Sequence, residues 1–178
     1  RIYTADTDGM NWPSQSTRVS VVDINSFEFE KTITVSLNPN YIYSDSDGDV
    51  YVICMSDYSD DKSYIVQRID AKTDEVKTVE GIKAYKMTVA YDIAYIMFND
   101  YYANEVKYYK YDLKNEKLLS DNFITDGTVV SSPNGIGVDP VTGDIYVGKS
   151  NKKNNGEVYV FSSEGKLKSL FDTLPYPA

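Results

Sequence analysis

The feature that most constrains the fold of this chain is a strand pattern that returns at nearly constant spacing. The segments "DVYV" at Asp49, "DIAYI" at Asp92 and "DIYV" at Asp144 align with one another and with the opening "RIYTA". Their separations are 48, 43 and 52 residues. A period of roughly 20 to 50 residues marks one supersecondary unit copied along a chain. The chain is therefore expected to be an array of similar units.

Other strands recur in fixed order around the aligned one. A polar loop follows it, then a second strand that closes on Asp23, Asp70, Asp112 or Ser162, and then a third strand. A further strand precedes the aligned one in three of the four units, at residues 40–45, 85–91 and 134–139. Four short strands per repeat of roughly 40 to 50 residues are the signature of a β-propeller blade.

The sequence thus predicts an all-β protein, a β-propeller with about four four-stranded blades. The strands are rich in Val, Ile and Tyr and are separated by Gly, Asp, Asn and Pro. The predicted blades are residues 1–38, which lack the innermost strand, then 39–82, 83–124 and the terminal blade 125–178. Because residue 1 falls inside a repeat, we expect these blades to be the C-terminal half of a seven- or eight-bladed ring, with the remaining half as their partner. A closed ring of four blades is the alternative.

Composition excludes several functions. The chain has 27 acidic and 18 basic residues, a net charge of −9, and no histidine. Phosphate backbones repel so acidic a surface, so we expect no nucleic-acid partner. The absence of histidine excludes Ser-His-Asp and Cys-His catalysis within this chain. The single cysteine, Cys54, lies in an apolar run and is expected to be a buried small residue.

One stretch, "SDSDGDVYV" at 44–52, resembles a calcium loop because three carboxylates stand close to a glycine. An EF-type loop with Gly48 at its sixth position would place Tyr43 first and Cys54 twelfth, and neither side chain fits a calcium ligand. We therefore interpret Asp47-Gly48 as the turn of a hairpin, and we expect no metal site here.

The candidate binding residues lie in the loops that would share one face of a propeller. These loops join the second strand of a blade to its third, or one blade to the next. Flat aromatic rings with amide donors and acceptors suit a neutral or weakly polar ligand that contains rings, such as a corrinoid or a sugar. The alternative is that the rings seal neighbouring blades, as we expect for Tyr51, Tyr95 and Tyr146 on the aligned strands. The candidates are Asn11, Trp12, Asn40, Tyr58, Tyr85, Asn99, Tyr101, Tyr102 and Asn134.

Two classes of function remain open from the residues. The first is a non-catalytic binding module or interaction scaffold, which needs no cofactor. The second is a propeller hydrolase or lactonase with a metal in its channel. A hard cation needs several carboxylates, and the predicted innermost strands offer no convergent acidic set. We therefore predict that the chain is not an enzyme, unless the missing half completes such a site.

The last fifty residues contain the most specific sequence motifs, "SPNGIGVDPVTGDIYVGKS" at 132–150 and "NGEVYVFSSEGKLKSLF" at 155–171. They resemble the final blade of YVTN-type bacterial propellers, in particular the surface lipoproteins of gut anaerobes. This resemblance implies a place at the cell surface or outer membrane. It also implies capture of a small nutrient such as cobalamin, or a glycan, with an outer-membrane transporter as partner. Asn134 departs from the family pattern, which has tyrosine there.

Overall fold

The structure is a computed structural model that describes residues 1–11, 14–57, 64–100, 105–149 and 155–173. Its described residues confirm the all-β prediction, because the only helix among them is one 3₁₀ turn, η1 (Gly9–Asn11). Most strands are rich in Val, Ile and Tyr, and many of the turns between them contain Asp or Gly, which explains why the chain forms short strands and turns. Among these residues no helix is long and apolar enough to cross a membrane.

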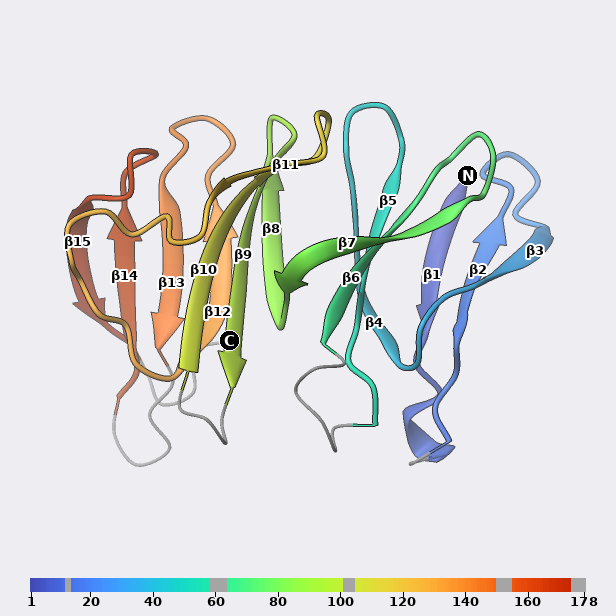
Figure 1. The fold of residues 1–178 in the computed structure, drawn as a ribbon, viewed down its shortest axis with the longest axis horizontal. Coiled ribbons are helices and arrows are strands. Elements are labelled where there is room, and N and C mark those ends of the chain that lie inside the picture. The colour runs from blue at the N-terminus through green and yellow to red at the C-terminus, as the bar shows by residue number, and fades with distance from the viewer. Residues whose placement is uncertain (12–13, 58–63, 101–104, 150–154, 174–178) are drawn as a thin grey trace. The chain divides into compact units, whose positions relative to one another are not determined.

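The strands form four antiparallel sheets in which neighbours in sequence pair with one another (Figure 1). The first sheet has three strands, β1 (Ile2–Asp6), β2 (Arg18–Val22) and β3 (Phe29–Thr34). The second contains β4 (Pro39–Ser44), β5 (Val50–Cys54), β6 (Ile65–Ile69) and β7 (Val76–Lys83). The third contains β8 (Lys86–Ala90), β9 (Ile93–Asp100), β10 (Glu105–Asp112) and β11 (Lys117–Ser120). The fourth contains β12 (Pro133–Val138), β13 (Ile145–Lys149), β14 (Glu157–Phe161) and β15 (Leu167–Asp172).

The chain divides into two compact units, Arg1–Ala84 and Tyr85–Ala178. In the first unit, one apolar cluster joins the first sheet to the second. Val19 and Val21 of β2 and Ile33 of β3 pack with Val50 and Val52 of β5. These valines and this isoleucine recur at every second position, which is the pattern of a strand that buries one face.

In the second unit, an apolar cluster joins the third sheet to the fourth. It contains Tyr95 and Met97 of β9, and Ile145 and Val147 of β13. Phe123, from the segment that connects the two sheets, lies in the cluster with its ring edge-on to Tyr95 at 5.5 Å between centroids. The connecting segment thus supplies part of the core.

The expectation that three aligned tyrosines pack between blades is only partly met. Tyr51 and Tyr95 are buried, but Tyr146 is exposed. Tyr95 stands one position later in its repeat than Tyr146 does, and a shift of one residue turns a strand side chain to the opposite face. Ile145 and Val147 point into the cluster, so Tyr146 between them points away from it.

Aspartates organise most of the short turns. The carboxylates of Asp23 and Asp70 each accept hydrogen bonds from the backbone amides two and three residues on, at 2.8–2.9 Å. Asp112, Asp126 and Asp139 make similar bonds. Hydrogen bonds hold the pKa of all five carboxyls below its ordinary value. The largest contribution comes from the Asn115 side-chain amide at Asp112, from the Leu167 backbone amide at Asp126, and from the turn amides at the other three. Asp23, Asp70 and Asp112, on which the second strand of each repeat was expected to close, therefore each begin a turn.

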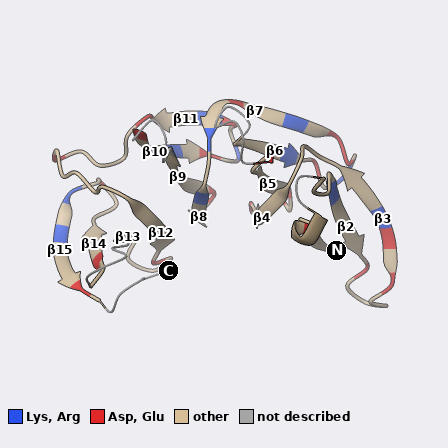
Figure 2. Cartoon of the chain, turned by 90° about the horizontal axis from the view of Figure 1, so that it is seen from below, with Lys and Arg blue, Asp and Glu red and all other residues tan. Residues whose placement is uncertain are grey.

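The last strand of each sheet is an edge strand, and each carries a lysine, as Figure 2 shows for β7 and β15. The lysines are Lys31 in β3, Lys77 in β7, Lys117 in β11 and Lys168 in β15. A charge on an edge strand opposes pairing with another edge. This placement protects the exposed backbone of each sheet from unwanted association.

Gly165, in the turn between β14 and β15, allows a close approach that no other residue would permit. Its φ is +80°, and a Cβ atom there would lie 1.7 Å from the backbone oxygen of Phe123. The amide of Thr125 donates to the Gly165 oxygen at 2.9 Å. The connecting segment is therefore bound directly to this turn.

We expect Gly165→Ala to lower the free energy of unfolding by about 3 kcal/mol or more, because it adds a backbone clash to a left-handed φ. The matched control is Gly127→Ala, where φ is +81° but no atom lies within 4 Å of the added carbon. That control should cost only about 1 kcal/mol. Urea unfolding of both variants measures the difference, and equal losses would contradict the close approach.

The turn carboxylates also predict a pH dependence. A carboxyl whose pKa is lower in the folded than in the unfolded chain stabilises the fold above its unfolded pKa. That stability is lost as the pH falls through the folded value, which here means below a pH of about 4. In Asp70→Asn the turn acceptor remains but does not titrate. We therefore expect its free energy of unfolding to fall less than that of the wild type between pH 6 and pH 3, measured by urea unfolding.

Candidate functional site

Each unit has two distinct edges, which follow from the strand order. In each four-stranded sheet, the first strand begins at the loop edge, where the loop from the second strand to the third also crosses. The hairpins between its first and second strands and between its third and fourth strands lie at the turn edge (Figure 1). In the three-stranded first sheet β1 corresponds to the second strand of the other sheets, so the β1–β2 loop lies at the loop edge and the β2–β3 turn at the turn edge. Every described candidate binding residue lies at a loop edge. Asn11 and Asn40 belong to the first unit, and Tyr85, Asn99 and Asn134 to the second. Trp12, Tyr58, Tyr101 and Tyr102 lie outside the described residues.

Asn40 and Asn134 occupy equivalent β-bulges in two different sheets. β4 begins Pro39-Asn40 and β12 begins Pro133-Asn134, and the pairing register shifts at both. The residue before each proline has a positive φ, +60° at Asn38 and +54° at Ser132. Residues before proline favour an extended φ, so this conformation is strained. A bulge redirects the side chain of its extra residue, and both asparagines are half-buried at the loop edge.

Asn38 shows how the strain in the first unit is sustained. Its amide donates to the Ser16 oxygen at 2.8 Å, and its oxygen accepts from the Met55 amide at 2.9 Å. Its side-chain Nδ2 donates to the Ser56 oxygen at 2.9 Å. The side chain is almost fully buried. Three loops of the first unit are therefore joined around the residue that positions the Asn40 bulge.

A buried acceptor lies next to this junction. Gln15, which precedes Ser16, is 6 % exposed, and its Oε1 has no hydrogen-bond partner among the described residues. An unpaired buried acceptor costs about 1–3 kcal/mol. Asn11, in contrast, is exposed and bonds locally, since its Nδ2 donates to the Asp8 carboxylate at 2.8 Å. Sequence reasoning named Asn11 and missed Gln15, because burial of a loop glutamine has no sequence signal.

In the second unit, the structure brings Asn99 and Asn134 together. The Nδ2 atom of Asn99, near the end of β9, donates to the backbone oxygen of Pro133 at 3.2 Å, and Asn134 is the next residue. Tyr85 precedes β8, and its amide donates to the Met97 oxygen at 2.7 Å. Its ring packs against the apolar cluster of this unit, and the Lys86 ammonium lies 6.0 Å from the ring centroid.

An ion pair at the same edge was not predicted. Lys149 ends β13 and lies opposite Glu157 of β14, with 2.6 Å between Nζ and Oε2. The Tyr159 hydroxyl donates to the same carboxylate oxygen at 3.1 Å. The hydrogen bond from Lys149 lowers the pKa of Glu157, and Glu157 raises that of Lys149. Lys149 also pairs in register with Pro133, so this charge-neutral group adjoins the Asn134 bulge.

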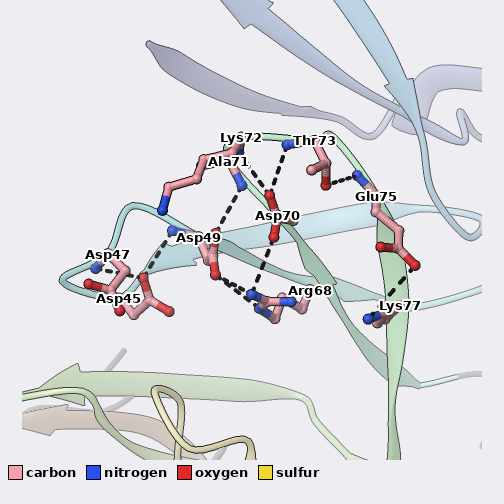
Figure 3. A network of polar contacts seen from close by, with 10 residues as sticks. All are labelled: Asp45, Asp47, Asp49, Arg68, Asp70, Ala71, Lys72, Thr73, Glu75 and Lys77. Carbon is pink, nitrogen blue, oxygen red and sulfur yellow. Dashed lines mark hydrogen bonds and ion pairs between the residues drawn. The ribbon is translucent and has the colours of Figure 1, made fainter.

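The acidic stretch 44–52 is a hairpin turn at the turn edge, as predicted (Figure 3). Gly48 has a φ of +89°, and the Asp45 carboxylate accepts from the amides of Asp47 and Asp49 at 3.0 and 2.9 Å. Asp49 accepts from the guanidinium of Arg68, with Nε at 3.1 Å, and from the Ala71 amide at 2.9 Å. Its carboxylate therefore joins the β4–β5 turn to the β6–β7 turn.

A metal site and a reactive thiol are the two other kinds of site that the sequence raised. Among the residues that the structure describes, no three His, Cys, Asp or Glu side chains are grouped so that they could hold a metal ion. Cys54 is fully buried, and burial raises the pKa of its thiol to about 12. It is therefore a core residue, as expected, and not a reactive thiolate.

Comparison with known proteins decides the fold. No protein-family model matches the chain, and no curated protein sequence matches it. Solved structures do match. The propeller of Dos1 has a TM-score of 0.63 at 13% identity, covering 96% of this chain and 43% of that one. TolB from Acinetobacter baumannii has a TM-score of 0.60 at 14% identity, covering 90% and 38%. The chain has the β-propeller fold.

A third propeller is also similar. The β-propeller domain of the trilobed protease from Pyrococcus furiosus has a TM-score of 0.50 at 9% identity, covering 76% of this chain and 43% of that one. The chain thus spans less than half the length of each of these propellers. Identities this low show the fold alone.

The hairpin interpretation of the acidic stretch gives a direct test. Asp49→Ala should lower the free energy of unfolding by about 2 kcal/mol, because it leaves Arg68 and the Ala71 amide without their shared acceptor. Both side chains of the ion pair are less than one-fifth exposed. The control Asp47→Ala, at an exposed position of the same turn, should change stability by less than about 0.5 kcal/mol.

Calcium at millimolar concentration should leave the Tm of the wild type and of both variants unchanged. A rise in the wild-type Tm that Asp47→Ala abolishes would show that the stretch is a metal site after all.

Proposed function

We propose that this chain belongs to a non-catalytic propeller that captures a small nutrient at its loop edges. The observation that carries the proposal is the pair of Pro-Asn bulges at the starts of β4 and β12, each preceded by a residue with a positive φ. A strained backbone persists only where the surrounding structure holds it, and such positions concentrate at ligand sites. In both sheets the bulge next to this strained residue carries an asparagine at the loop edge, which supports a binding role for Asn40 and Asn134.

The chemistry of the second unit's loop edge supports a neutral or weakly polar ligand. Tyr85 offers an aromatic ring, Asn99 and Asn134 offer amides, and Lys149 and Glu157 cancel each other's charge. Such groups suit a ligand that combines rings with amide or hydroxyl groups. Cobalamin, which has a large ring and peripheral amides, is the first candidate, and a glycan is the second. Cobalamin would be bound here as a ligand and not as a cofactor.

Two sequence features support the rest of the proposal. The chain has no histidine, and amides with a charge-paired carboxylate provide no activated nucleophile. The resemblance of residues 132–171 to YVTN-type surface lipoproteins supports a place on the bacterial cell surface, with an outer-membrane transporter as the partner that receives the nutrient. The YVTN type itself stays a prediction.

Isothermal titration calorimetry with cyanocobalamin and with neutral oligosaccharides tests the proposal. Tyr85→Ala should weaken binding by about 2 kcal/mol, as for a buried aromatic anchor, and Asn134→Ala by about 1.4 kcal/mol, which is tenfold in Kd. Trp12→Ala and Tyr58→Ala should also weaken it. The control is Tyr91→Ala, an exposed tyrosine at the opposite end of β8, which should leave Kd unchanged.

Two results would count against the proposal. No heat with any corrinoid or oligosaccharide would reject nutrient capture. Binding that Tyr85→Ala and Asn134→Ala leave intact would place the ligand elsewhere on the protein.

A further inference from the structure

Three turns of this protein share one backbone conformation, at 23–28, 70–75 and 139–144. In each, the first aspartate's amide donates to the oxygen of the sixth residue at 2.9 Å, and its oxygen accepts from the fifth residue's amide at 2.8–2.9 Å. The fifth residue has a positive φ in all three turns. These residues are Phe27 at +58°, Asp74 at +61° and Gly143 at +74°.

Phe27 does not suit this conformation. Glycine adopts a positive φ without steric cost, and aspartate tolerates it, whereas a bulky side chain is an outlier there. Packing does not compensate for the strain, because the Phe27 side chain is 73 % exposed. Gly or Asp at position 27, as in the other two turns, would make the fold more stable than Phe does. An exposed aromatic held in a strained turn is a reason to look for a function outside the fold.

Two neighbours of Phe27 are also apolar and exposed. Ile24 is 53 % exposed and Phe29, the first residue of β3, is 64 % exposed. The equivalent positions in the turn 70–75 and its strand are Ala71 and Val76, both half-buried. We call Ile24, Phe27 and Phe29 the apolar tip. Three large exposed apolar side chains within six residues are typical of an interaction site.

Charge limits the kind of partner. The charged residues between 23 and 30 are Asp23, Glu28 and Glu30, and this segment contains no Lys or Arg. Glu30 pairs with Arg1 at 3.0 Å, whereas Glu28 is exposed beside Phe27. An anionic lipid surface would repel this segment. A protein pocket with an apolar floor and a rim of Lys or Arg would match both the apolar side chains and the acidic flank.

We propose that the apolar tip is a docking anchor for a protein partner, with Phe27 seated in an apolar pocket that basic residues border. Aromatic side chains with acidic neighbours are effective anchors because they bury a large area while charge guides the encounter. The strained turn holds the Phe27 ring outward in the free protein, so little order is lost on binding. This inference does not depend on the proposed nutrient site, which lies at the loop edges.

A stability measurement separates this role from a structural one. Phe27→Gly keeps the turn, because Gly143 adopts the same conformation, and it removes the strain. We expect its urea midpoint to rise and its Tm to rise by about 2–4 °C. A fall in stability would show that Phe27 serves the fold and would overturn the proposal.

A binding measurement identifies the partner. The photo-reactive amino acid benzoylphenylalanine is placed at Ile24 in the complete protein, in the cells that naturally make it. The matched control is the same group at Lys72, which is exposed in the equivalent turn 70–75. We expect one protein adduct at position 24 and none at 72. The purified adduct protein should then bind the wild type at least tenfold more tightly than Phe27→Gly, and more weakly as salt is added.

Other outcomes would overturn the proposal. They are equal adducts at the two positions or none at either, adducts with lipid, adducts with a second copy of this chain, and a purified partner whose Kd Phe27→Gly leaves unchanged. Cyanocobalamin binding should be the same for wild type and Phe27→Gly, so a failed nutrient site and a failed docking anchor give different results.

Discussion

The interaction on which the rest of this structure depends is the burial of one sheet face against the next sheet. In a repeat architecture a single sheet cannot bury its apolar face alone and needs a neighbouring sheet to cover it. In the first unit, valines of β2 and β5 close that surface, and in the second unit aromatic and aliphatic residues of β9, β13 and the connecting segment do so. The repeat spacing follows from this requirement, because each sheet must present a similar face to its neighbour.

Because the apolar core holds the middle of each strand, the two ends of the strands can be stabilised by different interactions. At the turn edges, short carboxylates bond backbone amides, so the turns hold themselves in shape, and Asp49 joins two of them through Arg68 and Ala71. At the loop edges, the chain instead uses bulges, buried amides and the pair of Lys149 and Glu157. The turn edges are thus rigid by local chemistry, and the loop edges gain their form from contacts between loops distant in sequence.

That difference explains what the sequence could predict. The strands, their order and the turn aspartates were foreseeable, because each depends on a pattern within a few residues. The Asn40 and Asn134 bulges depend on cross-strand register, and the Lys149–Glu157 pair depends on which residues face each other across β13 and β14. The exposure of Tyr146 was misjudged because Tyr51, at the equivalent position, lies in β5, which is buried along its whole length, whereas β13 is buried on one face at this point. Among the loop candidates that the structure describes, Asn99 reaches the residue next to Asn134, since its Nδ2 donates to the Pro133 oxygen.

Residues with a strained, positive φ differ in how the surrounding structure holds them. That difference indicates which of them serve the fold and which serve binding. Asn38 has a left-handed φ, yet three hydrogen bonds to Ser16, Met55 and Ser56 make that conformation part of the packed structure. Phe27 has the same φ without burial, held only by the bonds of its own turn. A strained residue that the core supports positions its neighbours, here Asn40. Phe27 has no such support, and unlike the exposed Tyr91, which also has a positive φ, it lies beside two further exposed apolar side chains, Ile24 and Phe29. That combination is why we assign Phe27 to a protein partner.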